Sequence, residues 1–360
     1  MKANKEKARK ILVRPFTYIT QSVGDDSLKM CVLLGIQLLF LIISTSYKAV
    51  SVIIVSLVAS ILADILDKKL QDKKEDSDSF SIQISAVQGL ITGFLLPENY
   101  PLVTVFLVTF FSMALYKYMF GGYARAWLNP SIVSVACLWV IGSRVFPDFL
   151  VSFDILSMRN PSQFLIESGI FPNMKFDSQI TDALNNSIFS LFKVSVPEGY
   201  VSMFWDTGSV IPAFRFNFLT ILSSIIIFGE DYVKAIIPFT FLAVYFILIR
   251  YISPFFIGSI QIKGDVLLAM LTGGTLFYAT FVTGWYGTAP ATIPGKILTG
   301  LFAGSSAFFI AGPGTSPSGL VFSVLLTNVF SLIIVQSEAH YDRIRMEKLV
   351  CRKEASFNAD

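Results

Sequence analysis

Residues 30–66 read MCVLLGIQLLFLIISTSYKAVSVIIVSLVASILADIL, and this stretch decides the fold class. It holds two apolar runs, 30–46 and 49–66, each close to the ~20 residues that carry a helix across the hydrocarbon core of a bilayer. Over the whole chain 54% of the residues are hydrophobic and only 15% are charged, whereas an ordinary globular domain has about 25% charged residues. The sequence therefore predicts an all-α polytopic membrane protein that sits in a lipid bilayer.

Similar apolar runs recur along the chain and predict about ten transmembrane helices. The third run is short for a crossing, and the eighth contains adjacent glycines, so both are expected to be short or broken helices. The expected spans are 30–46, 49–66, 82–96, 102–119 and 130–146 in the first half and 216–229, 233–250, 264–284, 295–311 and 319–336 in the second.

The distribution of positive charge predicts the orientation. Most of the 28 Lys and Arg residues fall in segments that share a side with the N-terminus, and cytoplasmic loops carry the excess of such residues. We therefore expect both termini in the cytoplasm. The expected parts are a basic cytoplasmic leader (1–29), a first five-helix repeat (30–146), an extracytoplasmic loop or ordered cap (147–215), a second five-helix repeat (216–336) and a cytoplasmic tail (337–360).

The polar residues exclude several functions. The net charge of +3 comes from clusters at the termini and in one loop, so no basic face exists to neutralise the phosphates of a nucleic acid. One histidine and three scattered cysteines (Cys31, Cys137 and Cys351) argue against a zinc site, an all-cysteine iron–sulfur cluster and a disulfide framework. No catalytic triad and no metal site can be assembled.

The two halves repeat each other. The stretch 89–97, GLITGFLLP, has a counterpart in 271–278, LTGGTLFY, and the turn before the fifth span resembles the turn before the tenth. Because each half has an odd number of spans, the halves are expected to be inverted relative to each other. Glycine-interrupted spans at matching positions of inverted halves indicate a site near the membrane midplane. The alternative is that these glycines only allow close helix packing.

The motifs carry a resemblance to a known family. GLITGFLLP (89–97), FGGYARAWLNP (120–130), LTGGTLFYATF (271–281) and GLVFSVLLTN (319–328) together resemble the RnfD/NqrB family, and the chain is identified as a divergent member similar to the RnfD component of Rnf complexes. The resemblance implies a subunit of a translocase in the bacterial inner membrane, rather than an enzyme by itself. It would couple electron transfer through flavin to sodium or proton translocation, beside other membrane and peripheral subunits that supply nucleotide oxidation and iron–sulfur clusters.

The resemblance also implies a cofactor. Members of the family carry FMN as an ester on a threonine of the pattern Asp-x-x-Ser-Gly-Ala-Thr, and the matching stretch here runs from Asp182 to Ile188. Ile188 has no hydroxyl, so Ser187 is the neighbouring candidate acceptor, and non-covalent FMN or riboflavin is favoured over covalent FMN. A second departure lies at Phe281–Trp285, where the family usually has Thr-Asp-Pro. The candidate residues for an inner, non-covalent flavin site are Gly89, Thr92, Gly93, Gly273 and Gly274.

Two further functions stay open. An inverted repeat of five helices also suits a flavin-free channel or transporter, and the isoleucine at position 188 favours that alternative. The third possibility is a scaffold subunit that keeps contacts to partners and has lost its redox role.

Overall fold

The structure is a computed structural model that describes residues 23–70, 80–120, 126–148, 151–158, 160–191, 193–257, 264–285, 287–313 and 316–357. These residues form helices and no strand. Five helices are long and apolar enough to cross a membrane: α1 (Val23–Ile43), α2 (Tyr47–Leu70), α11 (Tyr232–Tyr251), α15 (Ile293–Ala311) and α16 (Gly319–Phe357). The prediction of an all-α, multi-pass membrane protein is confirmed at this level. Residues 1–22 of the predicted basic leader lie outside the described residues, as do 121–125 of the turn before α5.

Each of the other five predicted spans also contains helix. Three contain apolar helix over shorter stretches: α4 (Leu102–Phe120), counted as apolar helix over Leu102–Tyr116, α5 (Pro130–Gly142) and α10 (Asn217–Glu230). The third span is α3 (Ser81–Phe94), and the eighth is divided into α13 (Val266–Thr272), α14 (Thr275–Phe277) and the π-helical turn η5 (Tyr278–Val282). The short third span and the broken eighth span therefore coincide with the glycine-containing runs of the sequence. Small additional elements are η2 (Ser143–Val145), η4 (Pro212–Phe214) and α12 (Ser253–Ile257).

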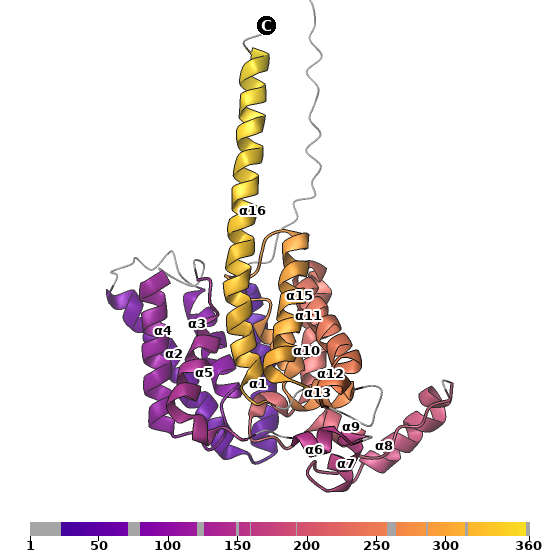
Figure 1. Ribbon diagram of the computed structural model, residues 1–360. Helices are drawn as coiled ribbons and strands as arrows, with labels where there is room; N and C mark the ends of the chain where they lie inside the picture. Colours follow the sequence, from indigo (N-terminus) through magenta and orange to yellow (C-terminus); the bar gives the residue numbers. More distant parts are fainter. Residues whose placement is uncertain are drawn as a thin grey trace, which may run out of the picture.

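The two halves pack in partly matching patterns. In the first half α2 contacts α1, α3 and α4, and α4 contacts α5; in the second half α11 contacts α10, α13, η5 and α15, and α15 contacts α16. Figure 1 shows α2–α5 as one lobe and α10–α15 as the other, with α16 extending far beyond the bundle. These neighbours correspond in part between the halves, whereas the contact of α3 with α5 has no equivalent of similar extent between the described residues of the eighth span and α16.

Some of the contacts between the halves join elements at corresponding positions. Helix α1 contacts α10, and α5 contacts α16. The rings of Phe94 on α3 and Phe277 on α14 lie 5.8 Å apart, and the rings of Trp139 on α5 and Phe322 on α16 lie 5.1 Å apart. A two-fold relation requires such contacts between like elements.

Side-chain caps mark where several helices begin. The side chain of Asn129 accepts a hydrogen bond from the backbone N–H of Ser131, and Pro130 occupies the first turn of α5. Asp231 caps α11, Asp265 caps α13 and Thr292 caps α15 in the same way. Such caps satisfy backbone donors that an open helix end leaves unpaired.

Segment 147–215 is built of short helices at one end of the bundle (Figure 1); we call it the cap. They are α6 (Phe153–Leu156), α7 (Pro161–Glu167), α8 (Asp177–Leu184), the π-helical turn η3 (Asn185–Phe189) and α9 (Tyr200–Trp205). Asp265 accepts a hydrogen bond from the backbone of Ser162 in α7. Arg215, paired with Asp206 at 2.5 Å, donates to the hydroxyl of Ser46 in the loop between α1 and α2. These polar contacts fasten the cap to the bundle.

The packing of α3 on α2 generates a testable prediction. A Cβ atom at Gly93 would stand 2.6 Å from the Cα of Ile53 and 2.3 Å from the hydroxyl of Ser56, both on α2. Gly93→Val should therefore destabilise the protein by about 1–3 kcal/mol, the usual range for overpacking, which a thermal melt of the detergent-purified chain measures. The control is Gly35→Val, since no neighbouring atom lies within 4 Å of that Cβ position on α1. Equal melting temperatures of the two variants would contradict the packing role.

Candidate functional site

The first of the two helix breaks follows α3, which holds three predicted site residues. Gly89 and Gly93 lie directly against α2: a Cβ at Gly89 would stand 2.8 Å from the Cα of Leu57 and 2.9 Å from the carbonyl oxygen of Ser56. The hydroxyl of Ser56 donates a hydrogen bond to the backbone carbonyl of Gly89 at 2.8 Å. The hydroxyl of Thr92 donates one to the backbone carbonyl of Gln88, also at 2.8 Å. These glycines thus serve close helix packing, and the space beside their Cα atoms is filled by α2 rather than open to a flavin ring.

The second break separates α13 from α14 and contains Gly273 and Gly274. Gly274 has φ +68°, and a Cβ there would stand 2.2 Å from the ring of Phe214, so glycine is required by both conformation and space. Because the helix is interrupted here, carbonyl groups at the end of α13 are not bonded by a continuing helix, and side chains donate hydrogen bonds to them. Thr275 donates to the carbonyl of Ala269 and Asn217 to that of Leu271, each at 2.8 Å.

Two buried side-chain amides, those of Gln88 and Asn129, connect α3, α5 and η5. Neither residue was selected from the sequence as part of a site. The oxygen of the Gln88 side chain accepts from the backbone N–H of Ser131 at 2.9 Å, which links α3 to the start of α5. The side-chain nitrogen of Asn129 donates to the carbonyl of Val282 at 3.4 Å, which links α5 to η5. The available signal was a glutamine inside an apolar run and an asparagine before a proline, since polar side chains at membrane depth are costly and usually have a task.

The predicted acceptor motif lies in the cap, on α8 and η3. Asp182, Ser187 and Ile188 are exposed, and the hydroxyl of Ser187 donates to the carbonyl of Ala183 at 2.6 Å. Ile188 offers no hydroxyl for an ester, and the hydroxyl of Ser187 is hydrogen-bonded within its own helix. The residues at this position do not fit a covalently attached FMN. They also lie away from the glycine breaks, so the structure does not bring the two groups of predicted residues together.

A cavity of about 400 Å³ lies at the end of the bundle away from the cap, beside the start of α11. We call it the α11 cavity. Its walls combine aromatic rings with charged groups: Phe228, Phe281 and Trp285 among the former, and Asp26, Lys29, Glu230, Asp231, Lys234 and Lys296 among the latter.

Ion pairs organise the charges of the α11 cavity. Lys29 pairs with Glu230, and Lys234 pairs with Asp26 at 2.5 Å. The ammonium nitrogen of Lys296 lies 3.5 Å from the carbonyl oxygen of Val233 in the first turn of α11. Gly284 also lines the cavity, and a Cβ there would meet only the carbonyl of Lys234 at 3.9 Å. The cavity is therefore a half-polar chamber with room for a planar ring system, of the size that small-molecule sites usually have.

Asp177 is the polar centre of the cap and is 1% exposed. Its carboxylate accepts hydrogen bonds from the backbone N–H groups of Gly199 (2.7 Å) and Ser202 (2.5 Å) and from the hydroxyls of Ser202 (2.6 Å) and Thr181 (3.0 Å). Burial by itself raises the pKa of this carboxyl, but the four hydrogen bonds outweigh burial and hold the pKa below its ordinary value. The charged form of Asp177 thus ties α8 to α9.

Because the pKa of Asp177 is lower in the folded cap than in the unfolded chain, its stabilisation is complete above about pH 4 and is lost as the pH falls through the folded pKa. Asp177→Asn should therefore loosen the cap at pH 7 by about 1.5–3 kcal/mol, the range for hydrogen bonds to a charged group. Hydrogen exchange of the α8 and α9 amides measures this, and the difference from the unaltered chain should shrink below about pH 4. The control is Asp182→Asn, on the exposed side of the same helix, which should change neither the exchange rates at pH 7 nor their pH dependence. Equal exchange of the α8 and α9 amides in Asp177→Asn and the unaltered chain at pH 7 would refute this role of Asp177.

Comparison with known proteins places the chain. A model of the NQR2, RnfD, RnfE family matches residues 10–340. The D subunit of the ion-translocating oxidoreductase complex of Vibrio vulnificus (strain YJ016) is 24% identical over 266 residues, 67% of this chain and 74% of that protein. The D subunit of the proton-translocating ferredoxin:NAD(+) oxidoreductase complex of Clostridium ljungdahlii is 25% identical over 251 residues, 68% of this chain and 70% of that protein.

A third relative differs in the ion that its name states. The D subunit of the Na(+)-translocating ferredoxin:NAD(+) oxidoreductase complex of Acetobacterium woodii is 22% identical over 255 residues, 69% of each chain. The sequence-based resemblance is confirmed by the family match, which covers nearly the whole chain. The chain belongs to the NQR2, RnfD, RnfE family.

Proposed function

We propose that this chain is the D-type membrane subunit of an ion-translocating electron-transport complex in a bacterial inner membrane. The family match over residues 10–340 carries the proposal, and three relatives bear names of subunits of such complexes. Partner membrane and peripheral subunits supply what this chain lacks, because its sequence holds three cysteines and one histidine, too few for its own all-cysteine iron–sulfur cluster.

The proposal includes two inverted sets of five helices with both termini in the cytoplasm. The partial correspondence in packing between α1–α5 and α10–α16 and the contacts between like elements support this arrangement. The positive residues of the chain also favour the cytoplasmic side for both ends. In this orientation the cap faces outward and the α11 cavity lies at the cytoplasmic end.

The proposal places a non-covalent flavin in the α11 cavity. Phe228, Phe281 and Trp285 give the cavity an aromatic wall for the tricyclic ring, and Lys296 offers a hydrogen-bond donor to its carbonyl groups or to a phosphate. A bound flavin supplies one- and two-electron transfer, while the protein positions it and tunes its environment. The filled space beside Gly89 and Gly93 favours this cavity over the glycine breaks.

The flavin content of the purified chain, expressed with its companion subunits, tests the proposal. We expect about one flavin per chain, retained by non-covalent contacts within a pocket of ordinary ligand size. Gly284→Leu should reduce the content at least about fivefold, since a leucine side chain of several carbon atoms fills part of a cavity of this class and its Cβ meets no close neighbour.

Gly229→Leu is the matched control, because Gly229 lies in the last turn of α10, has no neighbour within 4 Å of its Cβ position and does not line the cavity. Flavin retained equally in both variants would contradict the site. A folded preparation with no flavin at all would refute a redox role and favour the channel or the scaffold, which ion uptake into proteoliposomes distinguishes.

A further inference from the structure

Helix α8 and the π-helical turn η3 of the cap together form a helical arm, and one face of this arm is apolar. Helix α8 continues through η3 to Leu191, and Figure 1 shows this arm projecting from the cap beside the bundle. Three apolar side chains on one face are exposed, at spacings of eight and three residues: Ile180 is 41% exposed, Ile188 51% and Leu191 80%. Asp182, Asn186 and Ser190 follow one another at four-residue spacing on another face. An exposed apolar stripe on one side of a polar helix is typical of helices that lie in the surface of a membrane.

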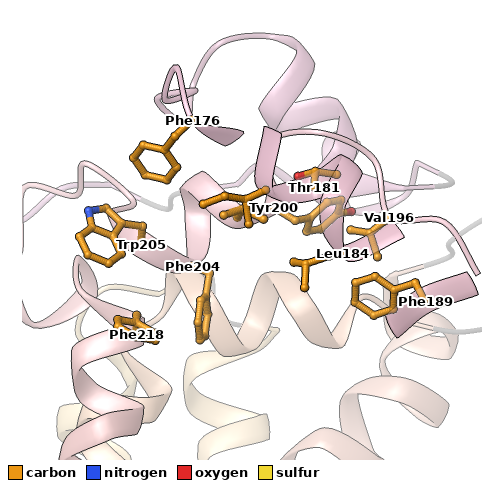
Figure 2. A pocket seen from close by; sticks show the side chains of 11 residues that line it. Phe176, Thr181, Leu184, Phe189, Val196, Tyr200, Phe204, Trp205 and Phe218 are labelled. Carbon is orange, nitrogen blue, oxygen red and sulfur yellow. The ribbon is translucent and has the colours of Figure 1, made fainter. Parts of the chain in front are cut away.

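A second cavity, of about 620 Å³, separates this arm from the bundle. We call it the arm cavity, and Figure 2 shows its side chains converging from α8, η3, α9 and α10. Almost all of them are apolar: Phe176, Ile180, Leu184, Phe189, Val196, Val201, Phe204, Trp205 and Phe218, with Thr181 and Tyr200 as the polar members.

The two hydroxyls of the arm cavity are already used. Thr181 donates to the carboxylate of Asp177 at 3.0 Å, and the hydroxyls of Tyr200 and Ser162 are hydrogen-bonded at 2.7 Å. Both hydroxyls thus have a protein partner already, and the indole N–H of Trp205 adds one more side-chain donor to an otherwise apolar lining. A flavin or a polar peptide loses its hydrogen bonds to water on entering such a site, which is costly, whereas a hydrocarbon chain loses none.

The arm cavity continues into a surface that faces lipid. Phe218 lines the cavity at the start of α10, and farther along the same face of this apolar helix Leu222 is 41% exposed and Ile225 62% exposed. Beside it, Trp205 and Phe218 stack at 5.6 Å. Tryptophan and tyrosine gather where a membrane protein meets the headgroup region. The cavity thus lies where the apolar row of α10 meets an aromatic cluster.

We propose that the arm lies in the surface of the leaflet on the cap side, with Ile188 and Leu191 toward the lipid, and that the arm cavity, of which Ile180 is a wall, holds an acyl chain of a phospholipid. The lipid chain covers apolar surface that the cap otherwise exposes, and it seats the arm against α9 and α10. This site is independent of the α11 cavity and of any flavin bound there.

Trp205 reports on occupancy, because it lines the cavity and bromine atoms on acyl chains quench tryptophan fluorescence at contact distance. The protein and its Trp205→Phe variant are reconstituted in phosphatidylcholine vesicles with or without brominated acyl chains, and the difference between them gives the emission of Trp205. We expect that emission to fall at least about twofold in brominated vesicles, as for an aromatic side chain at the boundary of headgroups and acyl chains. Native mass spectrometry of the detergent-purified chain should also show one retained phospholipid.

Ile188→Asp and Asn186→Asp form a matched pair on the arm, since both positions are exposed and the same charge is added to opposite faces. Ile188→Asp should restore the Trp205 emission in brominated vesicles and lose the retained lipid, and Asn186→Asp should leave both unchanged. Equal Trp205 emission in the two kinds of vesicle would overturn the proposal and leave a partner protein as the occupant. The same response in both arm variants would overturn it as well, because the apolar face would then have no special part.

Discussion

The constraint on which this structure depends is that every backbone N–H and C=O at membrane depth must find a partner inside the protein. The chain interrupts its helices after Phe94 and after Thr272, and side chains inside the bundle bond backbone groups at helix ends. Gln88 and Asn129 join α3, α5 and η5, while Thr275 and Asn217 take the carbonyls at the end of α13. The short third span and the broken eighth span also meet each other, at the rings of Phe94 and Phe277.

The sequence predicted the features that come from local pattern, and the structure bears them out where it describes them. Apolar runs located the helices, and the glycines located the short third and broken eighth spans. It did not predict the partners of Gln88 or Lys296, because those contacts join segments far apart in the chain, such as Gln88 with Ser131. The sequence predicted a loop or a cap in this region and did not predict the arm. Its apolar face crosses a π-helical turn, which disturbs the regular spacing of a helix. The inner flavin residues and the sidedness of the termini remain predictions.

The sequence of this chain matches the family model over most of its length, but it departs from the family pattern at Ile188, the predicted acceptor position for FMN. Its family match spans residues 10–340, yet the cap carries Ile188 where an ester needs a hydroxyl, and Ser187 is bonded to its own helix. In this chain the cap offers an apolar arm cavity, whereas the chamber with rings and charges lies at the other end of the bundle. The proposed function accordingly assigns the flavin to the α11 cavity and not to the cap.

The central claim is a flavin held without a covalent bond, and its fate on denaturation tests this most directly. The complex is purified with its companion subunits, this chain is separated on a denaturing gel, and flavin fluorescence is read in its band and in the filtrate of the denatured sample. The account predicts a dark band and about one flavin per chain in the filtrate beyond that of the companion subunits purified without this chain, as expected for a non-covalent site. A fluorescent band for this chain would contradict it, since that result requires an ester in the cap despite Ile188.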